Sequence, residues 1–132
     1  MTELVLALAN RDREAVDRLL ADDARFNSPV RSYDDRADVL HLLTTLGGLF
    51  DELWPVREWT GAGGAVTFVS VRVGALELDG MIEELHDDDR RITELTLMLR
   101  PLGALLSAVE QMGHALERAP LPRGGHPEPP QT

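Results

Sequence analysis

Glu84 and His86 are the two residues whose types and spacing could support acid–base chemistry. They lie two positions apart in segment 76–86, where alternating apolar residues predict a β-strand. Side chains two apart share one face of a strand, so the carboxylate and the imidazole would point the same way. Glu84 could then act as a general acid or base, with His86 as a proton relay. The alternative is that both belong to a solvated strand end.

The hairpin around Asp88 and Asp89 decides which face of the strand carries Glu84. If these two residues form the turn, Ile82 opposes Leu95 and Glu84 falls on the apolar, inward face. A slip of one residue would exchange the two faces. The inward face would then be formed by Leu76, Leu78, Ile82, Leu95, Leu97 and Leu99.

Five further residues are candidates for binding a substrate. The hydroxyls of Ser28 and Tyr33 could hydrogen-bond to a ligand, although Ser28 could equally bond to nearby backbone and the Tyr33 ring could pack over its turn. Trp54 and Trp59 flank a short apolar segment and could line a pocket mouth, or serve as core and dimer contacts. Ile82, on the apolar face, would contact the bound molecule.

The residue inventory excludes several kinds of chemistry. The chain has no cysteine, and all 13 of its basic residues are arginines, so there is no thiolate and no side-chain amine for a Schiff base. The sequence contains no His-x-x-x-His or similar cluster of metal ligands. We therefore expect neither a metal nor a cofactor.

Length and charge restrict the partners. A chain of 132 residues that is 43% hydrophobic fits one domain with a core. The formal charge of −10 argues against nucleic acid and against an anionic membrane surface. No leader-like start is seen and no segment is apolar enough to span a bilayer, so we expect a cytoplasmic protein.

The spacing of apolar residues changes along the chain from a helical period to a strand period, and it predicts the elements that position these residues. Apolar spacing predicts two short helices capped by Thr2 and Asp12, a strand over 24–28 and a helix over 37–53. Strands follow at 55–60, 65–73, 76–86 and 92–99, then a helix over 103–118. Helices packed on one face of an antiparallel sheet make an α+β domain over residues 1–118. The proline-rich residues 119–132 are predicted to be a disordered tail.

Several of these segments resemble one protein family. Residues 19–30 (LLADDARFNSPV) are similar to the opening of nuclear transport factor 2-like proteins. Residues 87–95 are similar to that family's acid-acid-Gly-Arg-Ile turn, with Arg90 in place of glycine, and 99–102 resemble its SnoaL-like branch. The resemblance implies a cone-shaped, curved antiparallel sheet wrapped by N-terminal helices, with a C-terminal helix. It also implies an apolar pocket and a homodimer through the outer face of the sheet.

The resemblance leaves the activity open. Ketosteroid isomerases of this family carry an aspartate base where this chain has Ser28, a tyrosine at the position of Leu4 and a second acid near Ile82. Polyketide cyclases often use an acid near that last position, and Glu84 lies one alternation further on.

Three hypotheses therefore remain. One is a cofactor-free isomerase, cyclase or dehydratase acting on an apolar, polyketide- or steroid-like substrate. The second is a non-catalytic ligand-binding or dimerisation module. The third is an epoxide hydrolase-like site using Asp79 and Arg100, which the expected register places on the outer face.

Overall fold

The computed structural model describes residues 1–124, which form four helices and six strands. The elements are, in chain order, α1 (Glu3–Ala9), α2 (Arg13–Leu19), β1 (Leu20–Asn27), β2 (Ser32–Tyr33), α3 (Arg36–Leu49), β3 (Glu52–Gly61), β4 (Gly64–Val73), β5 (Leu76–His86), β6 (Ile92–Arg100) and α4 (Leu102–Arg118).

Short polar side chains begin the first three helices. The hydroxyl of Thr2 accepts a hydrogen bond from the backbone N–H of Val5, and a carboxylate oxygen of Asp12 accepts one from Ala15. Asp35 does the same for α3. These bonds satisfy backbone donors that have no partner within the helix, and they confirm the predicted caps at Thr2 and Asp12.

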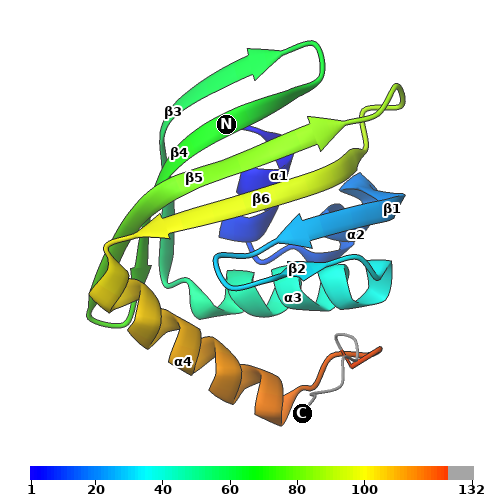
Figure 1. The fold of residues 1–132 in the computed structure, drawn as a ribbon. Helices are drawn as coiled ribbons and strands as arrows, with labels where there is room; N and C mark the ends of the chain where they lie inside the picture. The colour runs from blue at the N-terminus through cyan, green and yellow to red at the C-terminus, as the bar shows by residue number, and fades with distance from the viewer. Residues whose placement is uncertain (125–132) are drawn as a thin grey trace.

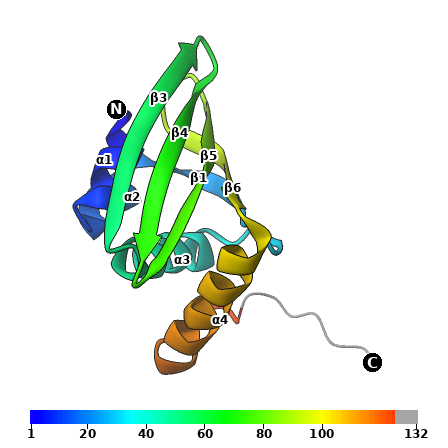
Figure 2. The same ribbon diagram turned by 90° about the vertical axis from the view of Figure 1, so that its left-hand side faces the viewer.

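The six strands form one curved, unclosed sheet in the order β2-β1-β6-β5-β4-β3. Helices α1, α2 and α3 lie on its concave side, and α4 projects from the end of β6 beside α3 (Figures 1 and 2). This α+β architecture confirms the expected fold class. One detail differs from the expectation: the sheet is mixed, because β1 runs parallel to β6.

The hairpin between β5 and β6 preserves the predicted faces although its register differs. Ile82 pairs with Leu97 and Glu84 with Leu95, two positions from the expected partners. The difference arises because the turn is longer than two residues and Arg90 adopts a left-handed conformation with φ 65°. A shift of two residues keeps every side chain on its face. Glu84 is accordingly 2% exposed, so the interpretation of a solvated strand end is wrong for this residue.

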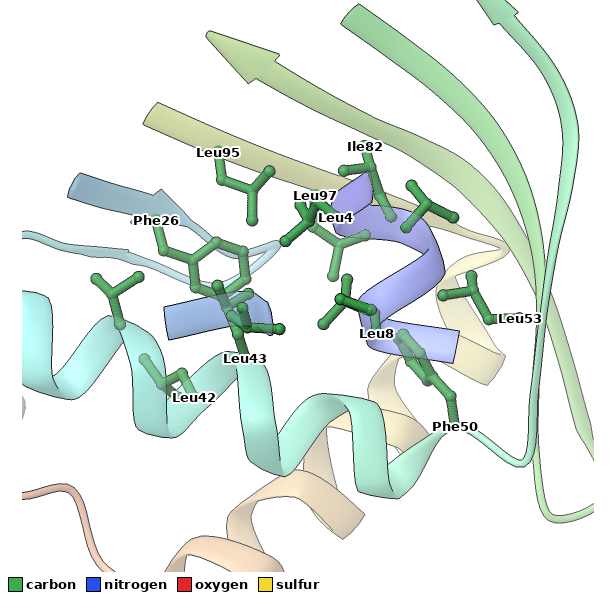
Figure 3. Close-up of a cluster of buried hydrophobic side chains, with 14 of the residues drawn as sticks. Leu4, Leu8, Phe26, Leu42, Leu43, Phe50, Leu53, Ile82, Leu95 and Leu97 are labelled. Carbon is green, nitrogen blue, oxygen red and sulfur yellow. The ribbon is translucent and has the colours of Figure 1, made fainter. Parts of the chain in front are cut away.

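The hydrophobic core fills the space between the concave face and the helices. Figure 3 shows Leu4 and Leu8 of α1, Phe26 of β1 and Leu43 of α3 directed towards one another. Helix α3 is shorter than predicted and ends at Leu49. The backbone N–H of Asp51 instead donates to the carbonyl of Arg72, which draws the following residues into the sheet.

Residues 119–124, at the start of the predicted tail, contact α3. The ring Nε2 of His41 lies 2.6 Å from the carbonyl oxygen of Ala119, and the backbone N–H of Arg123 donates to Asp38 Oδ1 at 2.7 Å. The remainder of the predicted tail, 125–132, lies outside the described residues.

Candidate ligand-binding site

An apolar pocket of about 230 Å³ lies between α4, α3 and the sheet. Helix α4 contacts β5 and β6, whose residues in the pocket come from the start of β5 and the end of β6. Ala108 is the one buried residue of α4 in the described structure. The main apolar residues of the lining are Phe26, Leu42, Leu46, Leu49, Phe50, Val73, Leu78, Leu97, Leu99, Leu105, Ala108, Val109, Met112 and Leu116.

Ser28 and Tyr33 are the residues with polar side chains in the described lining, and they differ in what they can offer a ligand. The Ser28 hydroxyl donates to the carbonyl of Arg31 at 2.9 Å and accepts from the N–H groups of Val30 and Arg31. It is therefore occupied by its own turn. The Tyr33 ring stacks on Phe26 with centroids 6.4 Å apart, while its hydroxyl makes no hydrogen bond to any residue of 1–124. Tyr33 is thus the donor that this pocket can present.

The environment of Tyr33 keeps its hydroxyl protonated. Burial raises the pKa of this phenol above its ordinary value, the guanidinium of Arg31 opposes the rise, and the carboxylate of Asp38 adds to it. At neutral pH the group is a neutral hydrogen-bond donor.

Glu84 lies in a different part of the concave face and has both carboxylate oxygens engaged. Oε2 accepts a 2.6 Å hydrogen bond from the Thr2 hydroxyl, and Oε1 lies 3.1 Å from Nε2 of His86. The structure therefore brings Glu84 and His86 together. It does not bring them to the apolar pocket, because neither is among the residues that line it.

The number of residues between them along β5 gives the distance between the apolar pocket and Glu84. Leu78 lines the apolar pocket, and Glu84 follows six residues later on the same strand. At ~3.3 Å per residue, the two Cα atoms are about 20 Å apart. A ligand held under α4 does not contact Glu84.

The remaining predicted residues fall into two groups. Ile82 is 2% exposed and lines a small void of about 10 Å³ on the core side of the pocket. Trp54 and Trp59 lie on the outer face of β3, with 60% and 54% of their surfaces exposed. Asp79 and Arg100 also lie on the outer face, which is the face that the sequence predicted for them. They form an ion pair there at 3.4 Å.

A second, polar pocket of about 370 Å³ also has Tyr33 in its lining. It is formed by β1, the segment around β2, the start of α3 and residue 123. Its lining is Arg25, Arg31, Ser32, Tyr33, Asp34, Asp35, Asp38 and Arg123.

Sequence reasoning missed most of both linings. The α3 and α4 residues of the apolar pocket follow a helical period. That spacing is the same whether the apolar face of a helix packs in a core or forms the wall of a cavity, so it does not distinguish the two. Arg25 carried no signal either, since it appeared as one charge in a short strand.

Within residues 1–124, no three His, Asp or Glu side chains are grouped so that they could hold a metal ion. No helix in that range is both long and apolar enough to cross a membrane.

A curved sheet wrapped by helices around an apolar pocket defines an α+β cone of the cystatin-like type. A steroid delta-isomerase from Pseudomonas aeruginosa superposes with a TM-score of 0.79 and 34% identity, over 85% of this chain and 85% of that one. A bacterial protein with a cystatin-like fold from Silicibacter pomeroyi gives a TM-score of 0.83 at 20% identity, over 89% and 84%. An NTF2-like protein from Cytophaga hutchinsonii gives 0.67 at 13% identity, over 78% and 88%.

The chain belongs to the nuclear transport factor 2-like superfamily, as its sequence motifs indicated. No family model matches the sequence. No curated protein matches it either.

Proposed function

We propose that this protein binds a small, largely apolar molecule in the pocket beneath α4. The observation that carries the proposal is the lining itself, which is apolar apart from the engaged Ser28 and the hydroxyl of Tyr33. Burying apolar ligand surface there is favourable by about 25 cal/mol per Å². A single hydrogen-bond donor among apolar walls then fixes the orientation of the ligand.

The same lining favours binding over acid–base catalysis. No carboxylate or imidazole of residues 1–124 lines the apolar pocket. Ser28 stands at the pocket without a paired base, and a serine hydroxyl alone does not remove a carbon-bound proton at neutral pH.

Two glycines of α4 supply a matched test. Gly113 lines the pocket, Gly103 does not, and a Cβ atom built on either meets nothing within 4 Å. Leucine at either position should strengthen the helix, because glycine is a poor helix former. Gly113→Leu should fill pocket volume, whereas Gly103→Leu should not.

Isothermal titration with decanol and with a steroid ketone measures the effect. We expect the wild type and Gly103→Leu to bind alike, and Gly113→Leu to bind about tenfold more weakly or worse. Absence of binding to the wild type, or equal affinities for all three proteins, would overturn the proposal.

A second candidate is an acid–base isomerase that uses Glu84 and His86. Two observations favour it: the 34% identity to a protein described as a steroid delta-isomerase, and the buried carboxylate beside an imidazole. This candidate requires the steroid to bind next to Glu84 rather than in the pocket beneath α4. Glu84 would then take the proton from the carbon between the ketone and the double bond. It would return that proton to the far alkene carbon, leaving the conjugated enone.

Turnover of a β,γ-unsaturated steroid ketone, followed by the ultraviolet absorbance of the enone, tests this candidate. Activity in the wild type that is lost in Glu84→Gln and kept in Ser28→Ala would support it. Absence of activity in a wild type that binds the steroid would exclude it for this substrate and leave the binding function.

A further inference from the structure

A further cavity of about 240 Å³, which we call the N-terminal pocket, is formed by residues of α1, the turn after it, α2 and α3. These three helices contact one another (Figure 1). No residue of its lining belongs to the lining of the apolar pocket beneath α4. The N-terminal pocket is therefore a separate place at which a small molecule could bind.

The wall of the N-terminal pocket includes three buried apolar side chains. Leu8 comes from α1, Val16 from α2 and Leu43 from α3. A ligand that covers the remaining exposed surface of these side chains removes apolar area from water, which favours binding. The wall thus suits a ligand with an apolar body.

Two arginines line the same pocket, and both have unused N–H donors. Nη2 of Arg11 donates to the carbonyl oxygen of Phe50 at 3.0 Å, which ties this guanidinium to the end of α3. The other N–H groups of Arg11 donate to no residue of 1–124. Arg13 is exposed and makes no hydrogen bond or ion pair within that range.

The turn that carries these arginines is held in place by backbone hydrogen bonds. The N–H of Arg11 donates to the carbonyl of Leu8 at 3.2 Å, and the N–H of Asp12 donates to the carbonyl of Ala7 at 2.9 Å. Arg11 has a left-handed backbone with φ 56°. The arginines therefore start from a fixed backbone, which lowers the entropic cost of binding a ligand.

The charge of this lining is positive, although the chain as a whole is acidic. Two arginines face one carboxylate, that of Asp12, and its Oδ1 already accepts from the backbone N–H of Ala15 at 3.1 Å. The polar pocket that includes Tyr33 has three arginines and three aspartates, so its charges balance. In a chain with a formal charge of −10, the N-terminal pocket is thus a local site for an anion of single charge.

We propose that the N-terminal pocket binds a small organic carboxylate, with its apolar body on Leu8, Val16 and Leu43 and its head group on Arg11 and Arg13. Guanidinium groups pair with carboxylates through parallel N–H donors. This second site goes beyond the proposed function and does not depend on the pocket beneath α4.

Three ligands with the same phenyl body separate the head group from the body: phenylacetate, 2-phenylethanol and 2-phenylethylamine. Each is titrated at neutral pH into ¹⁵N-labelled protein, and the amide chemical shifts are followed. We expect phenylacetate to move the amides of Gly47 and Gly48, which line the N-terminal pocket, and not that of Gly113 in the other pocket. Its affinity should be about threefold to tenfold higher than that of the alcohol, with the amine the weakest.

Variants of the charged residues test the assigned contacts. Arg13→Gln should remove the advantage of phenylacetate and leave the affinity for 2-phenylethanol unchanged. Arg18→Gln is the matched control and should behave as the wild type, because Arg18 is an exposed arginine of α2 that does not line the pocket. Asp12→Asn should increase the affinity for phenylacetate, since asparagine also caps helices but carries no like charge.

Three results would overturn this assignment. They are equal affinity for phenylacetate and 2-phenylethanol, equal losses in Arg13→Gln and Arg18→Gln, and a shift of the Gly113 amide without one at Gly48. The binding function beneath α4 is tested by decanol, the steroid ketone and Gly113→Leu, so either proposal can fail without the other.

Discussion

The hydroxyl of Thr2 donates a 2.6 Å hydrogen bond to Oε2 of Glu84, so the residue that caps α1 also holds the end of β5. The two residues are 82 positions apart in the chain. The bond joins the first helix to the middle of the sheet through one buried carboxylate.

Removing that hydroxyl should destabilise the fold. Thr2→Val keeps the shape of the side chain but loses both the cap and the bond to Glu84. A lost cap costs about 1 kcal/mol, and a buried acceptor left without a partner costs about 1–3 kcal/mol more. Urea unfolding should therefore show a decrease of about 2–4 kcal/mol in the free energy of unfolding. Thr2→Ser retains the hydroxyl and should lose much less; an equal loss in both variants would assign the effect to methyl packing.

The ionisation of Tyr33 should be shifted to higher pH in the folded protein. Tyr33 is the single tyrosine of the chain, so the ultraviolet absorbance of phenolate reports this residue alone. Because burial raises its folded pKa, the proton on the phenol stabilises the fold below the unfolded pKa of about 10. That stabilisation is lost as the pH rises through the folded pKa. We expect a midpoint above 10 in buffer and near 10 in urea, and coincident midpoints would contradict the burial of the ring.

Gly80 should be required by the close approach of β5 and β6. A methyl group built on Gly80 would overlap the carbonyl oxygen of Met98, so Gly80→Ala must push the strands apart. We expect a loss of about 1–3 kcal/mol in urea unfolding. Gly48→Ala is the control, because its Cβ meets nothing within 4 Å and alanine favours the helix. A neutral Gly80→Ala would mean that the sheet accommodates the methyl group by a small local adjustment.

The outer face of the sheet should be covered by a second copy of the chain. Trp54, Trp59 and Met98 are each more than half exposed on this face, and the family resemblance implies a dimer formed through it. We predict a dimer by sedimentation velocity, with tryptophan fluorescence protected from iodide. Trp54→Glu should shift the mass towards the monomer, whereas Leu106→Glu, an equally exposed leucine of α4, should not. A monomeric wild type with quenchable tryptophans would contradict this assembly.

Strand faces were predictable from the sequence, whereas strand pairing was not. Alternation placed Leu78, Ile82 and Glu84 on the inward face, and all three are buried. The register depended on the conformation of Arg90, whose positive φ lengthens the turn. The sequence marked this position only through the family resemblance, in which Arg90 stands where the turn has glycine. The parallel pairing of β1 with β6 joins segments far apart in the chain and leaves no local signal.

The candidate site was predictable only where a residue type was unusual. Ser28 and Tyr33 were predicted to bind a ligand because they are polar residues near the first strand, and both line the apolar pocket. The pocket is formed by residues from α3, α4 and several strands, so it depends on how elements far apart in the chain pack together. Glu84 was correctly assigned to the inner face. Its distance from the pocket could not be predicted, because the position of the pocket along β5 is known only from the structure.

The parallel pairing of β1 with β6 has a consequence for how the chain acquires its structure. Strand β1 is made early, but its long neighbour is made last, roughly 70 residues afterwards, and closing a loop of that size carries a large entropic cost. During synthesis on the ribosome, β1 therefore has only the two-residue β2 as a hydrogen-bonded neighbour. Its free edge stays open to other chains until β6 emerges, so the nascent chain is most prone to aggregation before its final strand and helix have been translated.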